Sequence, residues 1–188
     1  RDGILKGLYR FKASEKKDAK LRAQLFGSGT IMFEVLKAQE ILEQKYGVAA
    51  DVWSVTSYKR LYRDGNDCER WNMLHPGETP HVPFVTQCLK DAPGVFVAAS
   101  DYMKVLPESI AQWVPRQLVA LGTDGFGRSE GRAALRDFFE VDAKHIVLAT
   151  LNALARDKQI DAGTLRKAIK DLGICLLYTS PSPRDRQK

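Results

Sequence analysis

The residue types best suited to chemistry gather in one stretch of the chain, which holds Cys68, His75 and His81. Thiolate and imidazole groups bind zinc, but zinc sites usually combine closely spaced pairs of ligands, and no second cysteine lies near Cys68. Prolines between and after the two histidines stiffen the segment against wrapping an ion. A Cys–His nucleophile needs an electropositive setting for its thiolate, and the sequence indicates none. We therefore predict neither a metal site nor a catalytic residue here.

A glycine-rich turn is a candidate phosphate site. Gly27-Ser28-Gly29-Thr30 follows a predicted strand and opens a predicted helix, where free backbone N–H groups can bind phosphate. The dinucleotide fingerprint requires a third glycine at the position of Met32, and the G-x-x-x-x-G-K-[ST] pattern is absent from the chain. A tight turn that needs small residues explains the segment better than a cofactor does, so no cofactor-binding residue is predicted.

Two further segments are candidate interfaces. The stretch from Asp64 to Asn72 is rich in polar side chains and holds Arg70 and Trp71, residue types that often anchor interfaces. An ordered surface loop and a contact with another domain or subunit remain open as its interpretations. The loop 122–129 holds three glycines after a predicted strand, at the edge where open α/β sheets place ligands, although a loop that lets Phe126 pack inward explains it better. The interface candidates are Asp64, Asp67, Glu69, Arg70, Trp71, Asn72, His75, Asp124, Phe126 and Arg128.

Composition limits the class of protein. The 188 residues correspond to about one domain, and 44% hydrophobic with 28% charged residues is close to the globular average. No apolar stretch approaches the roughly 18 residues of a membrane span, and three distant cysteines argue for a reducing, cytoplasmic compartment. The net charge is +6, but basic residues alternate with acidic ones, so nucleic-acid binding is not expected.

Strands and helices alternate along the chain. Strands are predicted at 3–11, 21–26, 51–56, 95–99 and 117–121, and helices at 31–46, 107–114, 129–139, 142–158 and 161–172. Thr30 is predicted to cap the first helix, short helical pieces are expected near 58–62 and 84–90, and 64–83 is predicted to be irregular. The alternation predicts an α/β three-layer sandwich with a mostly parallel sheet. The first two strands are expected to form a hairpin that supplies an antiparallel edge strand.

Four ordered motifs resemble a known family. The segment Asp64-Gly-Asn-Asp-Cys-Glu-Arg-Trp-Asn-Met-Leu-His-Pro76, continued by Thr79-Pro-His-Val-Pro83, closely resembles the C-terminal domain of large homodimeric pyruvate dehydrogenases. Leu25 to Ile31, Asp101 to Lys104 and Leu121 to Ser129 match the same family in the same order. The resemblance covers about residues 1–174 and predicts a transketolase-like C-terminal domain.

The resemblance implies an activity that belongs to a longer protein. Such enzymes use thiamine diphosphate and Mg²⁺ to decarboxylate pyruvate, then acetylate the lipoyl group of a partner acyltransferase. Their cofactor-binding and acid–base residues lie in two upstream domains, and the thiamine motif is absent here because Asp124-Gly125 lacks the preceding glycine. The resemblance therefore implies a fragment that binds no cofactor alone and contacts its upstream domains and a homodimer partner.

The segment 175–188 departs from the family. It resembles translated adapter sequence, and we predict that it is an irregular artefact; without it the net charge falls to +4. Two other functions remain open: a non-enzymatic interaction domain, and a nucleotide-binding α/β domain that uses Gly27 to Thr30.

Overall fold

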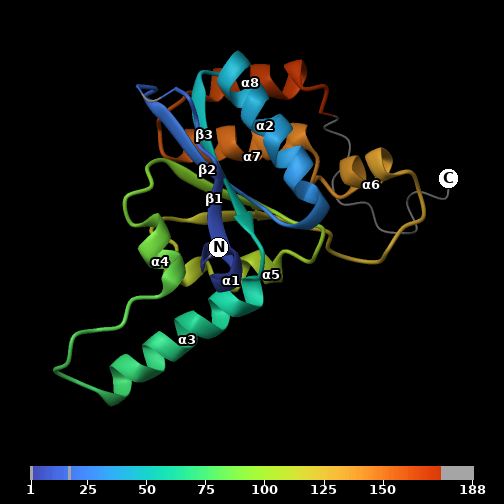
Figure 1. The fold of residues 1–188 in the computed structure, drawn as a ribbon. Helices are drawn as coiled ribbons and strands as arrows, with labels where there is room; N and C mark the ends of the chain where they lie inside the picture. The colour runs from blue at the N-terminus through green and yellow to red at the C-terminus, as the bar shows by residue number, and fades with distance from the viewer. Residues whose placement is uncertain (1, 17, 175–188) are drawn as a thin grey trace.

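The computed structural model describes residues 2–16 and 18–174, so the predicted tail at 175–188 lies outside the described residues. Five strands and the helices around them are arranged as Figure 1 shows. The strands are β1 (Leu8–Lys12), β2 (Leu21–Gly27), β3 (Val48–Val55), β4 (Val95–Ala99) and β5 (Leu118–Leu121). The helices are α1 (Asp2–Lys6), η1 (Gly29–Ile31), α2 (Met32–Lys45), α3 (Tyr58–Leu74), α4 (Phe84–Leu89), α5 (Val105–Glu108), η2 (Ala111–Trp113), α6 (Arg132–Phe138), α7 (Ala143–Arg156) and α8 (Ala162–Asp171).

The strands form one sheet in the order β1-β3-β2-β4-β5, in which the last four are parallel and β1 runs antiparallel to β3. An antiparallel edge strand is therefore present, but the predicted hairpin is wrong because β1 pairs with β3 and not with β2. β3 is buried at all but one of its positions, so its backbone needs hydrogen-bonding partners on both sides. β1 supplies the second side, with Leu8 opposite Val55.

Side chains of the central strands alternate between two hydrophobic cores. In β2, Ala23 and Leu25 face the layer of α2, α7 and α8, whereas Phe26 faces the layer that contains α3, α4 and α5. The sheet lies between these two layers (Figure 1). The predicted three-layer α/β sandwich with a mostly parallel sheet is confirmed.

The largest error of the sequence prediction concerns residues 64–83. Instead of a short helical piece and a long irregular segment, α3 is one helix of 17 residues, and only 75–83 lacks regular structure. Other differences are smaller: the start of the predicted strand 3–11 is the helix α1, and Thr30 lies inside η1. Thr30 therefore does not cap the helix as predicted, and no side chain caps η1 or α2.

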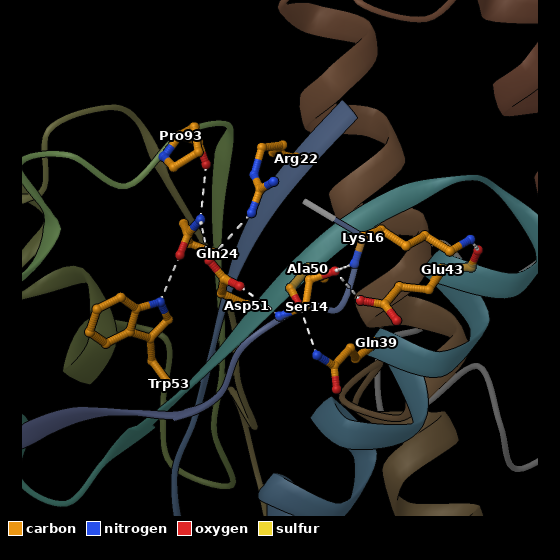
Figure 2. Close-up of polar contacts among 10 residues, drawn as sticks. All are labelled: Ser14, Lys16, Arg22, Gln24, Gln39, Glu43, Ala50, Asp51, Trp53 and Pro93. Carbon is orange, nitrogen blue, oxygen red and sulfur yellow. Dashed lines mark hydrogen bonds and ion pairs between the residues drawn. The ribbon is translucent and has the colours of Figure 1, made fainter. Parts of the chain in front are cut away.

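A buried polar network joins the middle of β2 to the middle of β3 (Figure 2). Gln24 in β2 accepts a hydrogen bond from the indole N–H of Trp53 at 2.7 Å and donates one to the backbone oxygen of Pro93 at 2.9 Å. Asp51 in β3 accepts the backbone N–H of Ser14 at 2.8 Å. Each buried polar atom named here has a partner, so the network fixes the connection after β1 against β3 at little desolvation cost.

Candidate interface surfaces

An arm, formed by α3 and the segment 75–83, projects beyond the sheet (Figure 1). At its root, the Ser57 side chain accepts a backbone N–H from the first turn of α3 at 3.2 Å. Farther along, a Cβ added to Gly65 would lie 2.5 Å from ring atoms of Trp113, so only glycine lets the helix approach this closely. The Trp113 indole N–H donates to Glu69 at 2.7 Å. Gly65 and Glu69 therefore determine where the arm crosses the body of the domain.

Two polar side chains of α3 hold the returning segment. The Asp64 carboxylate accepts the backbone N–H of Phe84 at 2.6 Å, at the first residue of α4. Asn72 exchanges two hydrogen bonds with the backbone of His81: its amide N–H donates at 2.9 Å and its oxygen accepts at 2.7 Å. Much of the polar density that marked this stretch in the sequence therefore forms contacts within the arm.

Trp71 lies at the centre of a stack of three rings. Its indole is 4.3 Å from the ring of His75 and 3.7 Å from the ring of His81, with nearly parallel planes. Two rings at these separations cannot share one face of the indole, so they cover its opposite faces. His75 also donates from Nδ1 to the backbone oxygen of Trp71 at 2.8 Å. The histidines therefore stiffen the arm and pack on tryptophan.

Cys68 lies on the same helix in a setting that disfavours a thiolate. Burial raises the pKa of its thiol first, and the nearby carboxylates of Asp64 and Asp67 raise it further. A reactive cysteine needs the opposite surroundings. Among residues 2–16 and 18–174, the grouping of potential metal ligands contains neither this cysteine nor the two histidines of the stack.

The outer part of the arm presents apolar side chains to solvent. Met73 is 71% exposed, and Leu74 and Val82 are also exposed. Asp67 and Arg70, farther back on α3, are also exposed. Of the predicted interface residues on the arm, these two are the ones most available to a partner, because the others have partners inside the domain: Asp64, Glu69, Trp71, Asn72 and His75.

A second exposed surface lies at the carboxyl-terminal edge of the sheet, where the loops after β4 and β5 are hydrogen-bonded to each other. The backbone N–H of Thr123 donates to the oxygen of Tyr102 at 2.9 Å, and the Asp124 carboxylate accepts the N–H of Lys104 at the same distance. Phe126, at 82% exposed, points outward, so the preferred sequence interpretation, inward packing of this ring, is wrong. The guanidinium carbon of Arg128 lies 5.2 Å from the centroid of the Phe138 ring.

The candidate phosphate turn is shielded by an acid. Gly29 has φ +53°, and the Asp101 carboxylate oxygens lie 3.5 and 3.6 Å from the position that its Cβ would take. A carboxylate beside these backbone groups repels a phosphate. A Cβ on Gly27 would meet the Met32 sulfur at 2.5 Å, so close packing explains this glycine. The geometry favours the tight-turn interpretation over a nucleotide site.

Two charged clusters escaped the sequence prediction. The buried Glu34 carboxylate accepts from Arg136 at 2.8 Å and from the backbone N–H of Ala143 at 3.1 Å. Asp137, Asp142 and His145 form the one potential metal-ligand group found in the described part of the chain. Lys144 pairs with both aspartates, so its single positive charge offsets part of their combined negative charge. Glu34 and Arg136 are too far apart in the sequence for any spacing to indicate the first cluster. The second cluster consists of residue types that are common at helix ends.

Comparisons with known proteins agree with this architecture. Residues 7–142 match the model of the transketolase-like TK C-terminal domain family. The pyruvate dehydrogenase E1 component of Escherichia coli is 49% identical over 174 residues, which cover 92% of this chain and 19% of that protein. The corresponding protein of Pseudomonas aeruginosa is 48% identical over 174 residues, which cover 92% and 20%. The chain thus spans about a fifth of the length of the curated relatives it matches, in their C-terminal region.

Solved structures share the fold. A transketolase of Pichia stipitis in complex with sedoheptulose 7-phosphate superposes with a TM-score of 0.58 at 16% identity, over 85% of this chain and 20% of that one. A split-gene transketolase described as an inactive beta4 tetramer gives a TM-score of 0.52 at 17% identity, over 79% and 42%. In the described residues, no helix is long and apolar enough to cross a membrane.

Proposed function

This chain belongs to the family of transketolase-like C-terminal domains, and from that membership we propose that it serves assembly in a pyruvate dehydrogenase E1 component, without contributing catalytic groups. The observation that carries the proposal is the 49% identity over 174 residues to the Escherichia coli enzyme. The longer protein would act in the cytoplasm, decarboxylate pyruvate and pass the acetyl group to a lipoyl-bearing acyltransferase.

Thiamine diphosphate and Mg²⁺ would be held by the part of the enzyme that precedes this region. The residues described here do not fit a diphosphate–magnesium site. Asp124, the acid of the Asp-Gly pair, uses its carboxylate on the backbone N–H of Lys104, and it lies 3.9 Å from the ammonium group of the same residue. The turn at Gly29 carries the Asp101 carboxylate, which would repel phosphate.

A chimera tests the proposed function. Residues 1–174 of this chain replace the matched C-terminal region of the Escherichia coli enzyme, and pyruvate decarboxylation and dimerisation are measured. We expect an active dimer, because nearly half of the residues are shared over 174 positions. A soluble chimera with no activity would contradict the proposal and favour a separate interaction domain.

The isolated chain provides the complementary measurement. Titration with thiamine diphosphate and Mg²⁺, and separately with NAD, should give no binding heat. Tight binding of thiamine diphosphate would show that the chain holds cofactor groups of its own. Tight binding of NAD would instead support the nucleotide-binding alternative at Gly27 to Thr30.

We assign the arm to the contact with a second copy of the enzyme. Its tip is apolar and exposed, and the ring stack on Trp71 makes it stiff, so docking it costs little conformational entropy. The double variant Met73→Ser, Leu74→Ser in the chimera should raise the dimer dissociation constant at least about tenfold. Phe11→Ser, on the edge strand β1, is the control and should leave dimerisation unchanged. Equal effects of both changes would contradict the assignment.

A further inference from the structure

Exposed apolar side chains are concentrated along one edge of the sheet. Seven of the twelve large apolar residues exposed in the described part of the chain lie at or beside the carboxyl-terminal ends of the strands. They come from α1, from the first turn of α2, from the loop after β4 and the start of α5, and from the loop after β5. This carboxyl-edge surface comprises Ile4, Leu5, Phe33, Tyr102, Met103, Val105 and Phe126.

The carboxyl-edge surface follows the whole width of the sheet. α1 lies at the β1–β3 side, Phe33 follows β2, Met103 follows β4 and Phe126 follows β5. Five strands about 4.8 Å apart make this row roughly 19 Å wide. Single exposed apolar residues are normal on a soluble protein, but the gathering of seven of the twelve along one edge of the sheet indicates a surface that is normally covered.

Ordered backbone holds these side chains outward. The loop after β4 is tied to the loop after β5 by the hydrogen bonds of Thr123 and Asp124, and Thr123 also donates from its hydroxyl to the Asp101 backbone oxygen at 2.7 Å. A Cβ on Gly122 would lie 2.5 Å from the backbone oxygen of Tyr102, so the two loops are in close contact. Their apolar side chains therefore form a preorganised surface.

The beginning of the chain reaches the same edge. Leu8 pairs with Val55, the last residue of β3, so β1 starts where β3 ends. Just before β1, α1 is fixed there because Thr56 donates from its hydroxyl to the backbone oxygen of Ile4 at 2.8 Å. Any polypeptide that precedes α1 therefore ends beside the carboxyl-edge surface.

We propose that the carboxyl-edge surface is the docking face for the domain that immediately precedes this region in the same polypeptide. The inference rests on the proposed function, in which this chain is the C-terminal fifth of a longer enzyme. A domain joined through α1 has a high effective concentration at this surface, and it needs no long linker to reach it. The arm and the carboxyl-edge surface thus have different partners: a second copy of the enzyme and the preceding domain.

Methionine oxidation distinguishes these partners, because each surface carries one exposed methionine. Met103 is 57% exposed on the carboxyl-edge surface, and Met73 is 71% exposed on the arm. Peroxide oxidation of both is followed by mass spectrometry in the isolated chain and in the Escherichia coli chimera over a range of protein concentrations. An intramolecular contact protects independently of concentration, whereas a contact between copies is lost on dilution.

We expect Met103 to be oxidised at least about tenfold more slowly in the chimera than in the isolated chain, at every concentration. Met73 should be protected only where the chimera is dimeric. Equal oxidation of Met103 in both proteins would overturn the proposal. Protection of Met103 that disappears on dilution would overturn it as well, since the surface would then contact a second copy.

A pair of variants supplies an independent readout. Phe126→Ser should leave the unfolding transition of the isolated chain unchanged, because the ring is exposed there, but should lower that of the chimera. Phe11→Ser is again the matched control, since this ring is 52% exposed away from the edge. If Phe126→Ser left the chimera unchanged, the docking face would be wrong. Neither readout depends on enzymatic activity, so an inactive chimera would contradict the proposed function and still test this inference.

Discussion

The carboxylate of Glu34 and the guanidinium group of Arg136 lie 2.8 Å apart, although 102 positions separate them in the chain. Both side chains are largely buried, and the other carboxylate oxygen accepts the backbone N–H of Ala143. One acid near the start of α2 therefore joins α6 and the beginning of α7 to the helical layer.

Removal of this acid should be costly. Glu34→Ala leaves a largely buried guanidinium group and a buried backbone N–H without their acceptor, so the free energy of unfolding should fall by about 2–4 kcal/mol. Urea denaturation of the isolated chain measures the change. Lys37→Ala is the control, because that exposed ammonium lies 3.4 Å from the same carboxylate and should contribute less than about 0.5 kcal/mol. Equal decreases in the free energy of unfolding for both variants would contradict the prediction that the buried ion pair contributes more than the exposed one.

Gly65→Ala should destabilise the domain, although alanine usually stabilises a helix relative to glycine. Alanine in place of glycine within a helix ordinarily stabilises by up to about 1 kcal/mol. Here the added Cβ would lie 2.5 Å from the Trp113 indole, so we expect a loss of about 1–3 kcal/mol. Thermal and urea unfolding measure it, with Arg63→Ala on the exposed side of α3 as the near-neutral control. A stabilised Gly65→Ala protein would mean that α3 can shift away from Trp113.

Tyr58→Phe should stabilise the domain. The hydroxyl of Tyr58 is buried and has no hydrogen-bonding partner in the described residues, and burial raises its pKa far above the ordinary value. Removing an unsatisfied hydroxyl should raise the free energy of unfolding by about 1 kcal/mol, measured by urea denaturation. Leu61→Ala, one turn away in the same core, should instead destabilise by about 2–5 kcal/mol. If Tyr58→Phe lowered the free energy of unfolding, the hydroxyl would have to make a favourable hydrogen bond, which contradicts the premise of this prediction.

Asp161 should make the start of α8 sensitive to acid. Its pKa lies below the ordinary value of 3.8, first because its carboxylate accepts the Thr164 backbone N–H, and then through the Thr164 hydroxyl and the Gly163 backbone N–H. The folded state favours the charged form, so its contribution is present above the ordinary pKa and is lost as pH falls through the lower, folded pKa. An NMR titration should show the Asp161 carboxyl and the Thr164 amide changing together. Asp161→Asn should abolish this step in the amide shift.

The extent of sequence-based prediction differs among the elements. The continuous apolar run of β4 identified a central buried strand because every residue of it is covered. α3 was missed in its second half because Asp64-Gly-Asn-Asp67 has low intrinsic helix propensity. The contacts that support this half of the helix join Gly65 and Glu69 to Trp113, which lies more than 40 positions away.

The candidate surfaces show the same limit. Polar and aromatic residue types at 64–75 indicated a region of specific contacts, but the sequence could not separate contacts within the arm from contacts with a partner. The glycine-rich loop 122–129 was expected to let Phe126 pack inward, but its ring is 82% exposed. The ion pair of Glu34 and Arg136 has no local signal at all.

Because the sheet lies between the two hydrophobic cores, a substitution in one core should not change the stability that the other core contributes. Leu151 belongs to the core under α2 and α7, and Leu89 to the core under α3 and α4. Residues in different cores with no shared partners lose stability independently, so Leu151→Ala and Leu89→Ala should have additive effects within about 0.5 kcal/mol. A defect on one side can therefore accumulate without weakening the other, until the sum exceeds the stability of the whole domain.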